Sequence, residues 1–106
     1  MSVEQIKLSR NTLSELPNKQ AVYGVFAQDK TSRQPVHCRY VGETENLSVR
    51  AATHFSPTEP NDRLKEFMQS GKTKLIVYEL MPDSTEEERQ EKLAQWVTKH
   101  HPKNGK

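Results

Sequence analysis

The sequence predicts an α/β (α+β) fold in which a three-stranded sheet is flanked by helices, in the order strand, strand, helix, helix, strand, helix. Two β-type runs, residues 21–28 and 36–43, are separated by polar turn formers at residues 29–34, which is typical of a β-hairpin. Residues 73–81 form a third strand, and their nearly continuous apolar centre indicates that both of its faces are covered. The 106 residues contain no internal repeat, so one domain is expected.

The predicted helices lie between and after these strands. Residues 45–55 carry an apolar stripe at helical spacing, and residues 56–60, which contain two prolines, must then form a loop. A second helix is expected over residues 61–71, where a glycine ends it. The last helix covers residues 84–99 and begins with a capping-box pattern, Ser84-Thr85-Glu86-Glu87.

The N-terminal part of the chain shows weaker patterns. Residues 1–16 are expected to lead into the domain proper, which covers residues 17–104. Residues 1–10 are expected to be held loosely, and Asn11 then caps a single helical turn that stops before Pro17.

Composition excludes several classes of protein. A net charge of only +2 means that any affinity for nucleic acid must come from locally placed Lys and Arg. Cys38 is the single cysteine, which excludes an intramolecular disulfide framework and a multi-cysteine zinc site. The charged N-terminus is not typical of a secretory signal, and no apolar run approaches the ~20 residues that a membrane helix needs. We therefore expect a cytoplasmic protein with no membrane association.

Four residues form the main candidate site. Tyr23 and Tyr40 lie in the two strands of the hairpin, and Arg50 and His54 lie four residues apart on the helix that follows. Side chains at that spacing share one helix face, so two phenols, a guanidinium and an imidazole can converge. Each of these residues alone is more often a packing or solvated residue, and the hypothesis depends on the four together. Such a set is suited to handling a phosphodiester.

The order and spacing of these residues resemble the GIY-YIG nuclease family. Ala21-Val22-Tyr23 stands where that family has its first signature tripeptide, and Tyr40-Val41-Gly42 stands where it has its second. Arg50 and His54 follow Tyr40 by ten and fourteen residues, as the corresponding Arg and His do in several members. The resemblance covers roughly residues 17–104, and it implies the fold of that family.

The resemblance also implies an activity, the hydrolysis of DNA phosphodiester bonds by an endonuclease with Mg²⁺ or Mn²⁺ as cofactor. Tyr23 and Tyr40 would orient or deprotonate the attacking water, and His54 would support that proton transfer. Arg50 would make a bidentate contact with the scissile phosphate, which a lysine does less well. A divalent cation, held by one glutamate of the last helix, would assist the leaving group.

This chain departs from the family at the metal-binding glutamate. Counting back from the aromatic residue of the last helix, and separately from the proline after it, leads to Leu93. Glu91 is the replacement that we predict, although two residues shift a side chain by about 200° around a helix. Glu86, two turns earlier on the same face, and Glu43 or Glu45 from the other side remain alternatives. Without any of them, the domain would bind without cutting.

Further contacts with nucleic acid are expected from scattered basic and polar residues. Arg39 lies beside Tyr40, Lys99 begins a basic tail, and Asn104 stands where the family often has a late asparagine. Two other hypotheses stay open. One is a catalytically reduced member that binds nucleic acid or a protein partner through the same surface. The other is an unrelated α/β interaction domain, in which the phenols and the arginine would not share a cleft.

Overall fold

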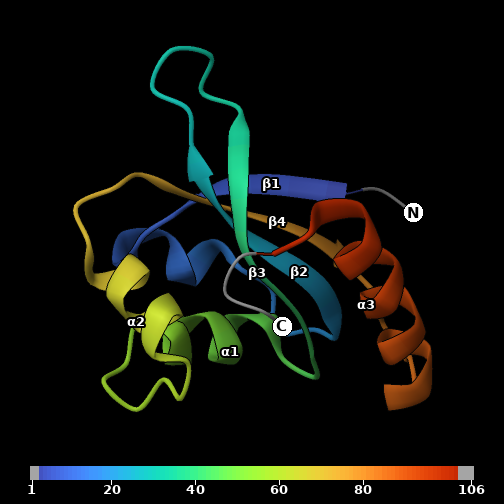
Figure 1. Ribbon diagram of the computed structural model, residues 1–106. Helices are drawn as coiled ribbons and strands as arrows, with labels where there is room; N and C mark the ends of the chain where they lie inside the picture. The colour runs from blue at the N-terminus through green and yellow to red at the C-terminus, as the bar shows by residue number, and fades with distance from the viewer. Residues whose placement is uncertain (1–2, 103–106) are drawn as a thin grey trace.

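The computed structural model describes residues 3–102, and these form one antiparallel sheet with helices on both faces (Figure 1). The strand order across the sheet is β1-β4-β2-β3, so β4 and β2 are central and β1 and β3 are the edges. The four strands are β1 (Val3–Leu8), β2 (Ala21–Gln28), β3 (Pro35–Thr44) and β4 (Lys74–Leu80). The predicted hairpin is present, and its tip projects from the body of the molecule in Figure 1.

The sheet has four strands, so the expected three-stranded sheet is wrong in this detail. Residues 3–8, expected to be a loosely held lead-in, form β1 and pair along their whole length with β4. Such an edge strand is difficult to predict from sequence, because few of its side chains are buried and it shows little apolar alternation. Leu8 is nevertheless part of the core, which ties this segment to the rest of the domain.

Three helical segments cover one face of the sheet and one long helix covers the other (Figure 1). The helical segments are η1 (Arg10–Glu15, a 3₁₀ helix), α1 (Leu47–His54), α2 (Asp62–Gln69) and α3 (Glu86–His100). Alternate residues of β2 point to opposite faces, so Tyr23 and Val25 pack under η1, α1 and α2, whereas Val22 and Phe26 pack under α3. The site described below lies where these two layers meet, at β3.

Asparagine and threonine side chains set the helix starts. Asn46 and Asn61 accept hydrogen bonds from backbone N–H groups in the first turns of α1 and α2. The capping box of α3 lies one residue later than predicted, with Thr85 as N-cap and Glu88 as its reciprocal partner. The N-terminal helical turn is capped from Ser9 and not from Asn11. Within the described part of the chain, no helix is long and apolar enough to cross a membrane.

Candidate active site

The structure brings the predicted aromatic residues into one cluster. Tyr23 on β2 lies opposite Gly42 of β3, and its hydroxyl is 2.7 Å from Nε2 of His54 at the end of α1. The ring of Tyr40 packs against both, with centroids 6.1 Å from Tyr23 and 5.1 Å from His54. Arg50 projects from the same helix face as His54, as the four-residue spacing requires. The hairpin and α1 therefore position all four residues together.

A carboxylate that the sequence analysis did not select completes this cluster. Glu59, in the proline-flanked loop after α1, is almost fully buried, and its Oε1 lies 2.5 Å from Nδ1 of His54. The same oxygen accepts a hydrogen bond from Nη1 of Arg50 at 3.3 Å. Its Oε2 accepts one from the backbone N–H of Asn61 at 2.9 Å. The Asn61 cap and the two prolines fix the loop that holds Glu59, but no sequence pattern marks it as a partner of His54.

The contacts assign the protons along this chain of groups. Burial opposes the ionisation of Glu59, but the N–H of Asn61, His54 and Arg50 together outweigh it and lower its pKa. Burial, followed by the charge of Arg50, lowers the pKa of His54 below its ordinary value. A neutral imidazole facing a carboxylate carries its proton on Nδ1, so Nε2 accepts a hydrogen bond from the hydroxyl of Tyr23. Burial raises the pKa of Tyr23, which keeps the phenol protonated.

Gly42 packs closely against both tyrosines. A Cβ at Gly42 would lie 2.9 Å from Cε2 of Tyr40 and 3.0 Å from the hydroxyl of Tyr23, so a side chain does not fit without a shift. Tyr23 has no exposed surface, whereas the side chain of Arg50 is 27% exposed. Arg50 is therefore the member of the cluster with the most surface open to a reactant.

Beside Tyr40 and Gly42 lies a pocket of about 240 Å³, and its far wall is α3. Leu93 of α3, which the position counts assign to the family's glutamate position, lines this pocket and presents an apolar side chain there. Glu91 does not line the pocket: it lies on the exposed side of α3. Glu86, in the first turn of α3, is also exposed.

Glu43 is the carboxylate that lines this pocket, but its oxygens are occupied. Oε2 accepts a hydrogen bond from Nε of buried Arg89 at 2.7 Å, and Oε1 accepts one from Gln90 at 3.2 Å. Glu45 is exposed and approaches Arg89 to 3.7 Å. Among residues 3–102, no group of three His, Cys, Asp or Glu side chains can hold a metal ion. A hard divalent cation needs free carboxylate oxygens, so these residues do not fit one held from α3.

The other predicted nucleic-acid contacts lie apart from this cluster. Arg39 is the extra residue at a β-bulge of β3, where Val25 pairs with Tyr40 and Phe26 pairs with Cys38. Its guanidinium lies over the ring of Phe67, 4.9 Å from the centroid. Lys99 is exposed in the last turn of α3, and Asn104 lies outside the described residues.

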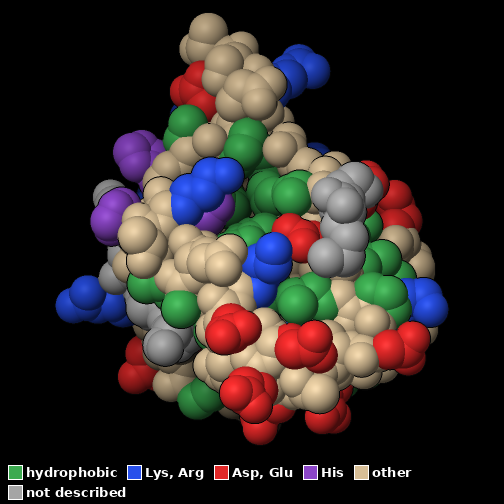
Figure 2. Space-filling view, turned by 90° about the vertical axis from the view of Figure 1, so that its right-hand side faces the viewer, with side chains coloured by type: hydrophobic (Ala, Val, Ile, Leu, Met, Phe, Trp, Pro, Cys, Tyr) green, Lys and Arg blue, Asp and Glu red, His purple; other side chains and the backbone are tan. Residues whose placement is uncertain are grey.

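Charge is distributed unevenly over the surface. Figure 2 shows the side of the molecule that carries α3, where acidic side chains gather at the lower end. The start of α3 contributes three consecutive glutamates, Glu86 to Glu88, to this region. A polyanion is repelled there, so it would approach the site from another direction.

Comparisons with known proteins identify the fold. No family model matches the chain, and no curated protein matches it in sequence. Solved structures of the GIY-YIG N-terminal endonuclease domain of UvrC from Thermotoga maritima match it in fold. A point mutant bound to its catalytic divalent cation gives a TM-score of 0.59 at 20% identity, over 90% of this chain and 91% of that chain. The form bound to magnesium gives a TM-score of 0.55 at 21% identity, over 90% and 92%.

Proposed function

We propose that this chain, which has a GIY-YIG-like fold, is an endonuclease domain that hydrolyses phosphodiester bonds of DNA. The observation that carries the proposal is the buried chain of hydrogen bonds from Tyr23 through His54 to Glu59, next to the partly exposed Arg50. A packing role for Tyr23 needs no such chain, because a buried phenol needs one acceptor and not an imidazole backed by a carboxylate.

In this proposal the hydrogen-bonded residues Tyr23, His54 and Glu59 remove a proton from the attacking water. Tyr23 accepts the proton of the water as it passes its own proton to Nε2 of His54. The carboxylate of Glu59 then stabilises the imidazolium through Nδ1, so that the charge does not remain unpaired in a buried site. Tyr40, which packs against both rings, orients the water at the rim.

Arg50 is proposed to neutralise the phosphate. Its guanidinium is held by Glu59 through one nitrogen, which leaves other N–H groups for the phosphoryl oxygens. These donors are fixed before the substrate arrives, and such preorganised donors stabilise the charge that develops in the transition state.

A divalent cation accompanies the solved neighbours, and it would supply Lewis-acid assistance at the leaving oxygen. Because Leu93 replaces a carboxylate and Arg89 engages Glu43, we assign no step of this mechanism to a cation. The same observation favours a second candidate function, in which the domain binds DNA or a protein partner through this surface without cutting. The predicted cytoplasmic location stays a prediction.

Plasmid nicking distinguishes the two candidates. Wild-type protein, Arg50→Ala and Arg50→Lys are compared with Mg²⁺, with Mn²⁺ and with EDTA. For an endonuclease we expect nicking by wild type and a loss of at least about 100-fold in Arg50→Ala, the scale of removing one preorganised donor. The lysine variant should recover part of the activity, since it keeps the charge without the fork. Nicking that Arg50→Ala retains would rule out this site as its source.

Absence of nicking by the wild type would favour binding without cleavage. In that case Leu93→Glu places a carboxylate in the pocket beside Tyr40. Gain of nicking, together with a rise in melting temperature on addition of Mg²⁺, would identify a nuclease fold that has lost its cation ligand. The matched control is Ala94→Glu, which puts the same charge on the exposed side of α3.

A further inference from the structure

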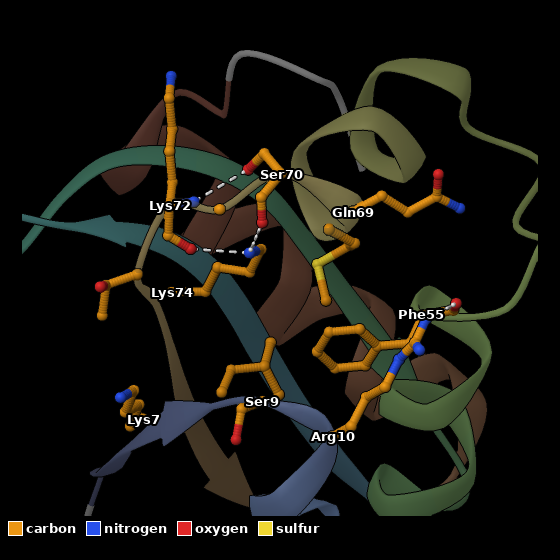
Figure 3. Close-up of a pocket in the computed structure, with 12 residues that line it drawn as sticks. Lys7, Ser9, Arg10, Phe55, Gln69, Ser70, Lys72 and Lys74 are labelled. Atoms are coloured by element: carbon orange, nitrogen blue, oxygen red, sulfur yellow. Dashed lines mark hydrogen bonds between the residues drawn. The ribbon is translucent and has the colours of Figure 1, made fainter.

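A second, strongly basic pocket of about 490 Å³ lies at the β1 side of the sheet, opposite the edge strand that carries Tyr40 (Figure 3). It opens between the end of β1 and the segment that joins α2 to β4. Four of its lining residues are cationic and none is acidic: Lys7, Arg10, Lys72 and Lys74. Hydroxyl groups of Ser9, Ser70 and Thr73 also line it. With a net charge of +2 for the whole chain, this gathering of four cations creates a local positive field.

Lys74 is the unusual member of this set, because its side chain is buried without an acidic partner. It is 6% exposed, and its ammonium donates to the carbonyl oxygens of Ser70 at 2.9 Å and Lys72 at 2.7 Å (Figure 3). It also lies over the ring of Phe67 at 5.4 Å. Within residues 3–102, no carboxylate forms an ion pair with it. Burial lowers the pKa of Lys74, so an anion in the pocket would stabilise its charged form.

Arg10 forms the opposite wall and is exposed. Its Nη2 donates to the carbonyl oxygen of Phe55 at 3.4 Å, and the guanidinium lies 5.7 Å from the centroid of that ring. Figure 3 shows Arg10 and Phe55 together on one side of the pocket and Lys74 on the other, while the side chain of Lys72 extends outward from that side. Donors on two walls can approach a tetrahedral oxyanion from two directions.

A string of contacts leads from this pocket to Arg39 on the strand that carries Tyr40. The Phe67 ring that Lys74 contacts is also covered by Arg39, the residue before Tyr40. Nε of Arg39 is buried and has no hydrogen-bond partner among the described residues. Lys72 lines both the basic pocket and a neighbouring hollow to which Arg39 contributes. Cationic groups therefore extend from the Tyr40 strand to the pocket.

We propose that the pocket lined by Lys7, Arg10, Lys72 and Lys74 is a second phosphate-binding site, which holds a backbone phosphate of a nucleic-acid strand away from Arg50. The assignment of this phosphate to a nucleic-acid strand rests on the proposed function. The binding of phosphate by the pocket does not, because it follows from the cations alone. Free inorganic phosphate has the same chemistry.

The test is an amide-resolved NMR titration of the full chain with two probes, inorganic phosphate and a short single-stranded DNA. Both probes are applied to wild type, to the double variant Lys72→Ala with Lys74→Met, and to Lys19→Ala. Methionine keeps the buried volume of Lys74 without its charge, and Lys19 is an exposed lysine that lines none of these pockets. Unchanged spectra of the unliganded variants outside residues 70–74 establish that they fold.

We expect DNA to shift the amides of Ser9 and of residues 70–73 in wild type. In the double variant, the affinity should fall about tenfold or more at low salt. The slope of log affinity against log salt should become shallower by about 0.7 for each phosphate of the single strand that the variant no longer neutralises. Lys19→Ala should bind like wild type. Shifts of the same amides by inorganic phosphate, with DNA binding no tighter, would support the site and assign it to free phosphate.

Absence of shifts at these amides with both probes would overturn the proposal, as would equal reductions of affinity in the double variant and in Lys19→Ala. Arg50→Ala separates this inference from the proposed function. If only the proposed function is wrong, the wild type does not nick DNA, but amides of the basic pocket still respond to phosphate in Arg50→Ala. If only the basic pocket is wrong, its amides do not respond, but nicking that depends on Arg50 is still observed.

Discussion

Replacement of Glu59 tests whether the buried hydrogen-bond chain exists in solution. In Glu59→Ala, Nδ1–H of His54 and the backbone N–H of Asn61 lose a charged acceptor. Hydrogen bonds to charged groups contribute about 1.5–3 kcal/mol each, which gives about 3–6 kcal/mol for the two. Removing one partner of a buried pair costs about 3–5 kcal/mol. We add nothing for Arg50, because its side chain is partly exposed and an exposed ion pair contributes little.

Glu59→Gln removes the negative charge of this side chain and keeps its shape. The amide oxygen still accepts one hydrogen bond, so each contact falls from the charged to the neutral range, a loss of about 1 kcal/mol per bond. We therefore expect the free energy of unfolding to fall by about 2 kcal/mol for Gln and by about 3–5 kcal/mol for Ala. Small domains are stable by about 5–15 kcal/mol, so the alanine variant should be marginal and the glutamine variant folded.

Urea denaturation followed by circular dichroism measures these differences. For a domain of this size, about 2 kcal/mol corresponds to a drop of roughly 8–16 °C in Tm. The control is Glu15→Gln, an exposed carboxylate whose replacement should change stability by less than about 0.5 kcal/mol. If Glu59→Gln behaved like Glu15→Gln, Glu59 would not be engaged with His54, and the proton-transfer mechanism would be wrong.

Three further predictions concern the same region. Gly42→Ala should destabilise the domain by about 1–3 kcal/mol in thermal melts, because the new Cβ meets the ring of Tyr40, and an unchanged Tm would mean that the tyrosines are not packed as observed. Burial lowers the folded-state pKa of His54 to about 4, whereas its unfolded value is about 6.5, so the unfolded chain binds more protons between these two pH values. Stability of the wild type should therefore fall as pH decreases below about 6.5, and His54→Gln should lack that part of the slope in pH-dependent urea titrations. Arg89→Met leaves the carboxylate of Glu43 without its ion-pair partner, and the free energy of unfolding should fall by about 3 kcal/mol. This is the low end for a buried pair, because Glu43 keeps some solvent contact. A loss below about 0.5 kcal/mol in the same titration would mean that the pair is not formed.

Local patterns in the sequence were sufficient for most of the elements. The hairpin, the β4 strand and the three main helices follow from β-type runs beside turn formers, from a continuous apolar run, from helical periodicity and from a capping-box pattern. The edge strand β1 was missed because its side chains are mostly exposed and its stability comes from pairing with β4. Strand pairing is a long-range interaction, and a single short segment carries little signal for it.

The candidate site divides in the same way. Spacing alone placed Tyr23, Tyr40, Arg50 and His54 together, because a hairpin and a helix turn convert sequence distance into fixed geometry. Only the tertiary structure brought Glu59 from an irregular loop to His54, since no periodicity governs where a loop side chain points. It also paired Arg89 with Glu43 beside Leu93, across two elements that lie far apart in the chain. Electrostatic partners of this kind depend on which surfaces pack together, and packing is decided by the whole fold.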